Sequence, residues 1–177
     1  VGSEMCIRDR FNMGGSLAQV NLSPEKFINH EVGAKFDVSP EISLTAAIYK
    51  LQRQNIVSVL TATESVLIDG QETKGVELGV SGKLTSKWSM FGGYALQDGQ
   101  IDKTFLTGSP GSIQTTLSGA ELGQTPRQTF SLWNRYQFNE VWGAAIGVIS
   151  RSEMYALTST TTTSTILPGY TLSLIHI

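Results

Sequence analysis

Apolar and polar residues alternate with a period of two along much of the chain, most clearly between Lys74 and Gln97. One side of this stretch carries Val76, Leu78 and Val80, and further on Trp88, Met90, Tyr94 and Leu96. Because successive side chains of a strand leave opposite faces of a sheet, each half predicts a β-strand with one apolar face and one polar, glycine-rich face. The polar segment Lys83–Lys87 between the halves predicts a hairpin.

The same alternation predicts strands on both sides of this hairpin. Besides its two halves, the predicted strands are Glu31–Val38, Glu41 to about Asn55, a strand that opens at Pro126, Val141–Arg151, and a last strand that begins at Leu167. The predicted fold class is therefore all-β. We expect an antiparallel meander of about six full strands and a truncated seventh.

The connections between these strands alternate in length. The short ones are Ser39-Pro40, Lys83–Lys87 and Asn139-Glu140, and the long ones include Gly99–Thr125 and the tract Thr158–Thr165. In a meander, alternate connections emerge at the same end of the sheet, so all short turns lie at one end and all long loops at the other. This asymmetry is typical of an outer-membrane β-barrel, with short periplasmic turns and long extracellular loops.

A barrel of this kind must close on itself, because lipid offers no partner for an unpaired backbone group. About six strands are fewer than the usual even numbers of roughly 8 and above. We therefore expect the chain to be one sector of a larger transmembrane barrel. A water-soluble antiparallel sheet with one face on a core produces the same alternation and stays the alternative.

Aromatic residues flank the predicted strands beside the short turns. They are Trp88, Tyr136, Phe138 and Trp142. Aromatic girdles mark the membrane interfaces of outer-membrane barrels, so these four residues are predicted to lie at the periplasmic interface. Charged residues on the polar strand faces are predicted to face the lumen, and the candidates are Glu31, Lys35, Glu77, Arg127, Arg135 and Arg151.

The two ends of the chain can be encoded by opposite strands of one short DNA. Met5–Arg10 can be read from ATG TGT ATA AGA GAC AGN, and the complementary strand encodes Leu172–Ile177. This DNA resembles the mosaic-end adapter of transposase-made sequencing libraries. We therefore expect Val1–Arg10 and Leu172–Ile177 to be adapter-encoded, and Phe11–Thr171 to be a partial barrel with both natural termini missing.

Composition excludes several kinds of chemistry. Outside the suspect ends the chain has no cysteine and one histidine, His30, which excludes a disulfide framework, a Cys/His zinc cluster and a cysteine nucleophile. The net charge of −2 gives no basic excess for nucleic acid. No apolar run approaches the ~20 residues of a membrane-spanning helix. Without a supported nucleophile and base, the chain is not expected to be an enzyme.

Five segments in a fixed order carry a resemblance to a known family. They are LSPEKFINHEVGAKFD (Leu22–Asp37), LTAAIYKLQRQN (Leu44–Asn55), KGVELGVSGKLTSKWSMFGGYALQDGQI (Lys74–Ile101), GQTPRQTFSLWNRYQF (Gly123–Phe138) and LPGYT (Leu167–Thr171). Together they resemble the C-terminal half of the barrel of TonB-dependent siderophore receptors. The resemblance implies a 22-stranded barrel in a Gram-negative outer membrane, plugged by an N-terminal domain. It also implies import of ferric siderophores with energy relayed by TonB from the inner-membrane proton gradient.

The resemblance also implies which partners to expect. They are outer-membrane lipid, a ferric siderophore as the transported ligand, and the TonB complex through an N-terminal part that this chain lacks, while no covalently bound cofactor is expected. Without the plug the fragment is not expected to transport alone. The alternatives are another TonB-dependent receptor, for cobalamin or oligosaccharide, and a non-transport β-protein such as a surface adhesin.

Two roles are open for the lumen-facing arginines, Arg127 and Arg135. They could pair with acids on neighbouring strands, which is the structural expectation, or meet the plug or an anionic ferric chelate. Among loop residues, Tyr155 is the candidate for ligand contact, because Gly99–Thr125 is poor in aromatic residues. His30, at the rim, is expected to be a surface residue rather than a ligand.

Overall fold

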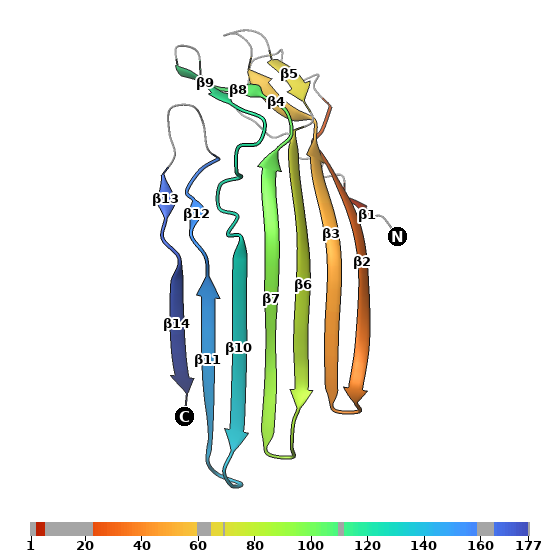
Figure 1. The fold of residues 1–177 in the computed structure, drawn as a ribbon, viewed down its shortest axis with the longest axis vertical. Coiled ribbons are helices and arrows are strands. Elements are labelled where there is room, and N and C mark those ends of the chain that lie inside the picture. Colours follow the sequence, from red (N-terminus) through yellow and green to blue (C-terminus); the bar gives the residue numbers. More distant parts are fainter. Residues whose placement is uncertain are drawn as a thin grey trace.

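The described residues form a single large antiparallel sheet with three small hairpins at one end (Figure 1). The computed structural model describes residues 3–5, 23–59, 65–68, 70–109, 112–158 and 165–176. The large sheet contains, in spatial order, β1 (Ser3–Met5), β2 (Lys26–Ser39), β3 (Ile42–Gln54), β6 (Gln71–Lys83), β7 (Trp88–Ile101), β10 (Gln128–Gln137), β11 (Gly143–Arg151) and β14 (Tyr170–His176). The fold class predicted from the alternation is confirmed.

The long connections all lie at the end of the sheet drawn at the top of Figure 1, which we call the loop end. They carry the hairpins β4 (Ile56–Val59) with β5 (Ser65–Ile68), β8 (Phe105–Ser109) with β9 (Ser112–Thr116), and β12 (Met154–Tyr155) with β13 (Ile166–Leu167). The three short turns gather at the opposite, turn end. Among the described residues, no helix is long and apolar enough to cross a membrane.

The structure changes several predicted boundaries. β2 begins at Lys26 rather than Glu31, and β7 continues to Ile101 into the segment expected to be a loop. The predicted two-residue turn Asn139-Glu140 is wrong, because five residues separate β10 from β11. Asn139 Oδ1 accepts the backbone N–H groups of Val141 and Trp142 at 2.9 and 2.8 Å, which holds this wider turn together.

The two terminal segments pair with the open edges of the sheet. β1 pairs with β2, and β14 pairs with β11 through residues that include Leu172–His176. An open edge presents unpaired N–H and C=O groups to any extended segment, so this pairing does not depend on the origin of the segment's sequence. The adapter origin of both ends stays a prediction, and residues 6–22 lie outside the described residues.

One face of the large sheet, which we call the apolar face, is hydrophobic and largely uncovered. Val32, Ile48, Val76 and Leu96 lie side by side across β2, β3, β6 and β7. Val32 is 72% exposed, and no second sheet packs on this face within the described ranges. The buried apolar residues of the described part, Ile56, Ile101, Phe105 and Met154, lie instead at the loop end.

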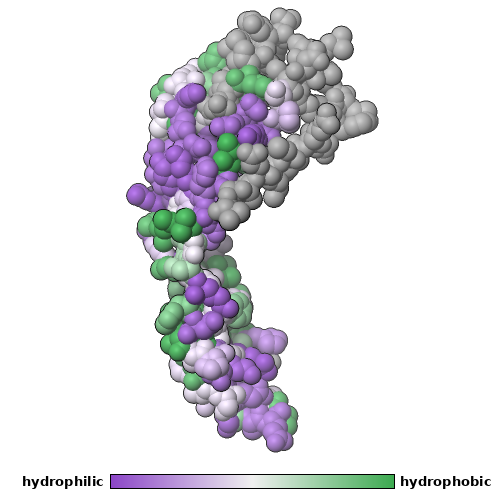
Figure 2. Space-filling model, turned by 90° about the vertical axis from the view of Figure 1, so that its right-hand side faces the viewer, coloured by the Kyte–Doolittle hydropathy of each residue, from purple (hydrophilic) through white to green (hydrophobic). Residues whose placement is uncertain are grey.

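The apolar face forms a belt of limited height. Figure 2 shows hydrophobic residues gathered in the middle of the thin sheet, between hydrophilic regions at the loop end and the turn end. On β7 the belt runs from Trp88 to Leu96, nine residues, which is close to the roughly 9–11 residues of a membrane-crossing strand. The strands continue above the belt toward the loop end.

Candidate functional site

The charged residues predicted to face the lumen all come from one face of the sheet, which we call the polar face. Register places Glu77, Ala95, Thr129 and Arg151 in one row across β6, β7, β10 and β11. Lys35 and Arg135 alternate onto the same face as Glu31. Arg127 precedes β10, and its carbonyl accepts the Gln97 N–H at 2.9 Å. Gln97 is in register with Gly75 and Tyr49, so Arg127 lies at the end of that row. Whether this face lines a lumen stays a prediction.

The glutamate and the arginine candidates of the polar face lie on different strands. Glu31 and Glu77 lie on β2 and β6, whereas the arginines belong to β10, β11 and the residue before β10. Within the described ranges, Arg127 and Arg135 form no ion pair with an acid. Arg135 instead donates to Gln137 Oε1 at 3.0 Å. The expected pairing with acids on neighbouring strands is therefore not seen in this sector.

A hollow of about 330 Å³ lies on the polar face between Glu77 and Arg151. Its floor is formed by small residues, Gly93, Ala95, Thr129 and Ser131. At one side the Arg151 guanidinium stacks over the Tyr170 ring, 4.8 Å from the ring centroid. The buried Arg151 Nε has no hydrogen-bond acceptor among the described residues. Arg151 lines this end of the hollow, where its guanidinium group is a hydrogen-bond donor for an anionic or carbonyl oxygen.

Aromatic residues also project from the polar face, and glycines make room for them. Phe91 and Trp133 stack across β7 and β10, with ring centroids 6.3 Å apart and planes inclined by 12°. A Cβ at Gly147 would lie 2.5 Å from the Trp133 ring, so only glycine leaves space for the indole. Alternation along β10 puts Trp133 on the same face as Arg135, whereas its stacking on Phe91 depends on strand register.

Tyr49 shows the same relation between an aromatic ring and a glycine. A Cβ at Gly75 would lie 2.5 Å from Cζ of Tyr49. The ring therefore lies over β6, and the Tyr49 hydroxyl donates to Gln97 Oε1 on β7 at 2.9 Å. This contact links three strands and could not be read from alternation alone.

The four aromatic residues predicted at the membrane interface gather at the turn end. Trp88 and Tyr136 are cross-strand partners, and the Tyr136 and Phe138 rings lie 5.4 Å apart at 59°. Trp88 Nε1 donates to Asn134 Oδ1 at 3.2 Å, and the Trp142 carbonyl accepts the Phe138 N–H at 3.0 Å. All four side chains are exposed. Their grouping beside the short turns fits an interfacial girdle, which itself stays a prediction.

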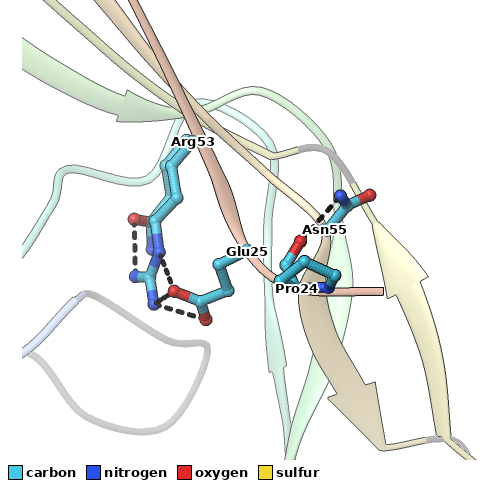
Figure 3. Close-up of polar contacts among 5 residues, drawn as sticks. Pro24, Glu25, Arg53 and Asn55 are labelled. Atoms are coloured by element: carbon cyan, nitrogen blue, oxygen red, sulfur yellow. Dashed lines mark hydrogen bonds and ion pairs between the residues drawn. The ribbon is translucent and has the colours of Figure 1, made fainter. Parts of the chain in front are cut away.

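A cluster of polar contacts fastens the start of β2 to the loop end of β3 (Figure 3). Arg53 donates through Nη2 to both Glu25 oxygens at 2.8 Å and through Nε to Oε2 at 3.1 Å. Its Nη1 reaches Gln71 Oε1 at 3.1 Å, and its guanidinium lies 5.7 Å from the Phe27 ring centroid. Nearby, Asn55 Nδ2 donates to the Pro24 carbonyl at 2.9 Å.

We expect Arg53→Met to loosen this fastening without unfolding the sheet. A bidentate, charge-assisted pair of partly exposed groups contributes about 1 kcal/mol, which corresponds to roughly fivefold faster amide exchange. Hydrogen exchange in the complete protein should therefore quicken in residues 24–27. Lys35→Met is the matched control, because Lys35 and Asp37 are both well exposed and 3.6 Å apart. Equal acceleration in both variants would contradict a local role for Arg53.

The remaining candidates lie at the loop end. Tyr155 is partly exposed on β12, and its carbonyl accepts the Gln124 N–H at 2.7 Å. Most of the tract Thr158–Thr165 lies outside the described residues. His30 is exposed, and no group of three or more His, Cys, Asp or Glu residues in the described ranges is placed to hold a metal ion. Ligand contact by Tyr155 stays a prediction.

Comparison with known proteins places this sheet among barrels. The family described as TonB dependent receptor-like, beta-barrel, matches residues 7–174. The probable TonB-dependent siderophore receptor PiuA of Acinetobacter baumannii is 26% identical over 137 residues, 76% of this chain and 18% of that protein. The catecholate siderophore receptor Fiu of Escherichia coli K12 is 28% identical over 125 residues, 70% of this chain and 16% of that protein.

A solved structure shares the fold. The crystal structure of the siderophore receptor PiuA from Acinetobacter baumannii aligns with a TM-score of 0.80 at 24% identity, over 90% of this chain and 23% of that one. This likeness extends over most of the open sheet. The chain spans about a fifth of the length of the curated relatives that it matches.

Proposed function

Because the chain belongs to the family of TonB-dependent receptor β-barrels, we propose that it is a sector of an outer-membrane receptor that imports ferric siderophores. TonB-dependent receptors are transporters rather than enzymes. The proposal rests on two properties of the large sheet. Its apolar face is exposed over a belt of membrane height, and its long connections gather at one end.

The proposed membrane location is supported by the unfavourable free energy of exposing the apolar face to water. A contiguous apolar surface of this kind is unfavourable in water and favourable in lipid. The belt ends at the turn end in four aromatic residues, as expected for a membrane interface. We therefore propose that the turn end faces the periplasm and the loop end the outside of the cell.

The substrate class is proposed from the relatives and from the chemistry of the polar face. PiuA and Fiu carry siderophore receptor in their names. In the proposed barrel the polar face lines the lumen, and within the described residues its Arg127 and Arg135 form no ion pair with an acid. Such guanidinium groups suit an anionic ferric chelate or an acidic surface of an inner plug domain.

Uptake by cells tests this proposal. Deletion of the complete gene that carries this chain should reduce uptake of a catecholate siderophore loaded with radioactive iron to the level of a strain without TonB. Expression of the complete receptor should restore it. Iron-limited growth on the same chelate should change in parallel.

The outcome distinguishes the proposal from its alternatives. Unchanged uptake of every ferric siderophore offered, with loss of cobalamin or oligosaccharide uptake, would assign the chain to another TonB-dependent receptor. Unchanged uptake of all these substrates would contradict a transport role.

A further inference from the structure

On the apolar face, two adjacent rows of side chains differ in polarity. The row Val32, Ile48, Val76, Leu96 is entirely apolar. The next row toward the loop end is His30, Lys50, Lys74, Asp98. Alternation keeps both rows on the same face. The upper boundary of the apolar belt therefore runs between these two rows.

A hollow of about 620 Å³ spans this boundary on the same face. The apolar row and the charged row both line it, so one side of the hollow is aliphatic and the other carries ammonium groups. Long lysine side chains cover apolar surface with their stems while their charged ends stay in a polar environment. The hollow therefore suits an amphiphile, with its apolar part toward the belt and its polar part toward the loop end.

The two lysines share one acidic partner. Lys50 Nζ lies 2.8 Å from Glu72 Oε2, and Lys74 Nζ lies 2.5 Å from Glu72 Oε1. Hydrogen bonds from these ammonium groups hold the pKa of the Glu72 carboxyl, which lies outside the belt, at about 2. Glu72 thus bridges two ammonium groups that lie on the neighbouring strands β3 and β6. Asp98, at the β7 end of the row, accepts a hydrogen bond from Gln100 Nε2 at 3.0 Å, and its carboxylate balances the second ammonium charge of the row.

Glu72 also fixes where the two ammonium groups lie. Its side chain is only 11% exposed, whereas that of Lys74 is 64% exposed. Gln52 Nε2 donates to Glu72 Oε2 at 3.0 Å and holds the carboxylate from β3. The ammonium groups are thus positioned in advance, and each keeps N–H donors for a further acceptor.

We propose that this hollow binds a phosphate-bearing membrane lipid, with its phosphate on Lys50 and Lys74 and its acyl chains over Val32, Ile48, Val76 and Leu96. The proposal rests on the proposed membrane location and not on the transported substrate. A membrane lipid fits because lipids surround the apolar belt of a membrane protein, with their head groups at the boundary of the belt. Phosphate accepts the charge-assisted hydrogen bonds that two neighbouring ammonium groups offer.

Lipid binding to the complete receptor in detergent tests the proposal. The probes are phosphatidic acid and diacylglycerol with the same acyl chains, and the readout is native mass spectrometry. Lys50→Gln with Lys74→Gln should weaken phosphatidic acid binding by about tenfold, because each lysine near an anionic lipid contributes up to about 1 kcal/mol, or fivefold. Diacylglycerol, which lacks the phosphate, should bind about tenfold more weakly than phosphatidic acid to the unmodified receptor.

Matched controls separate this site from general attraction to lipid. Lys83→Gln with Lys87→Gln removes the same charge at the turn end, and phosphatidic acid binding should stay within about twofold of the unmodified receptor. Heat-modifiable gel mobility checks that each variant is folded, and the single variants replace the double variant if it is not. If the folded Lys50 and Lys74 double variant bound phosphatidic acid less than about threefold more weakly than the unmodified receptor, the proposal would be overturned. Equal binding of diacylglycerol would overturn it as well, and neither result would bear on siderophore uptake.

Discussion

Ala46→Arg is expected to lower the free energy of unfolding of the receptor barrel by about 2–4 kcal/mol, the cost of an arginine near the bilayer midplane. Ala46 lies on the apolar face, in register with Ala34 and Leu78, and is exposed. Within the proposed barrel this position faces lipid at the middle of the belt. A guanidinium there loses its hydration without gaining a partner.

Ala47→Arg is the matched control, because the next residue along β3 points to the other face. Ala47 lies in register with Gly33 and Glu77, and an arginine there has an acidic neighbour. Its cost should stay below about 1 kcal/mol, since a partly solvated pair contributes little in either direction. Urea unfolding of the complete receptor in lipid vesicles measures both values. Equal costs would contradict the assignment of the apolar face to lipid, and a larger cost for Ala47→Arg would reverse the two faces.

Gly82→Ala should also destabilise the barrel strongly, by about 3 kcal/mol, from backbone strain and overpacking together. Gly82 has φ of 152°, which side chains rarely allow. An added Cβ would lie 2.0 Å from the Glu41 carbonyl oxygen and 2.7 Å from Ile42 Cα, both backbone atoms. The neighbouring Lys83 N–H donates to the same carbonyl at 2.9 Å, so β3 cannot move away without breaking this hydrogen bond.

Gly93→Ala is the control for this variant. A Cβ at Gly93 would approach only the Leu78 carbonyl oxygen, at 3.4 Å, which is ordinary contact. We expect its unfolding free energy to change by less than about 1 kcal/mol. The same urea titration compares the two variants. A Gly82→Ala barrel as stable as the Gly93→Ala barrel would show that the turn end can relax, contrary to the close approach of β6 and β3.

Much of the sheet could be predicted from local pattern. The alternation around Val76 and Leu96 predicted β6 and β7, and the other predicted strands correspond to β2, β3, β10, β11 and β14. The positions of the short turns predicted which end of the sheet carries the loops. The five-residue turn after β10 was missed, because the hydrogen bonds of Asn139 that shape it are not visible in alternation.

The loop end was the least predictable region. Gly99–Thr125 was expected to be a long loop, yet β7 reaches Ile101 and the hairpin β8–β9 follows. The short strands β8 and β9 contain too little alternation of apolar and polar residues to be predicted from the sequence. Ile101 and Phe105 are buried at this end, and burial between separate loops depends on which loops meet in space.

The period of two and the lengths of the connections are local properties, and they are sufficient to assign the strands, the two faces and the two ends of this sheet. Register is not local, because it depends on backbone pairing between residues far apart in the chain, and a shift by one residue would exchange the faces. For that reason the pairing of Lys50 with Glu72, the ring of Tyr49 over Gly75, and the hollow between Glu77 and Arg151 emerge only once the strands are side by side.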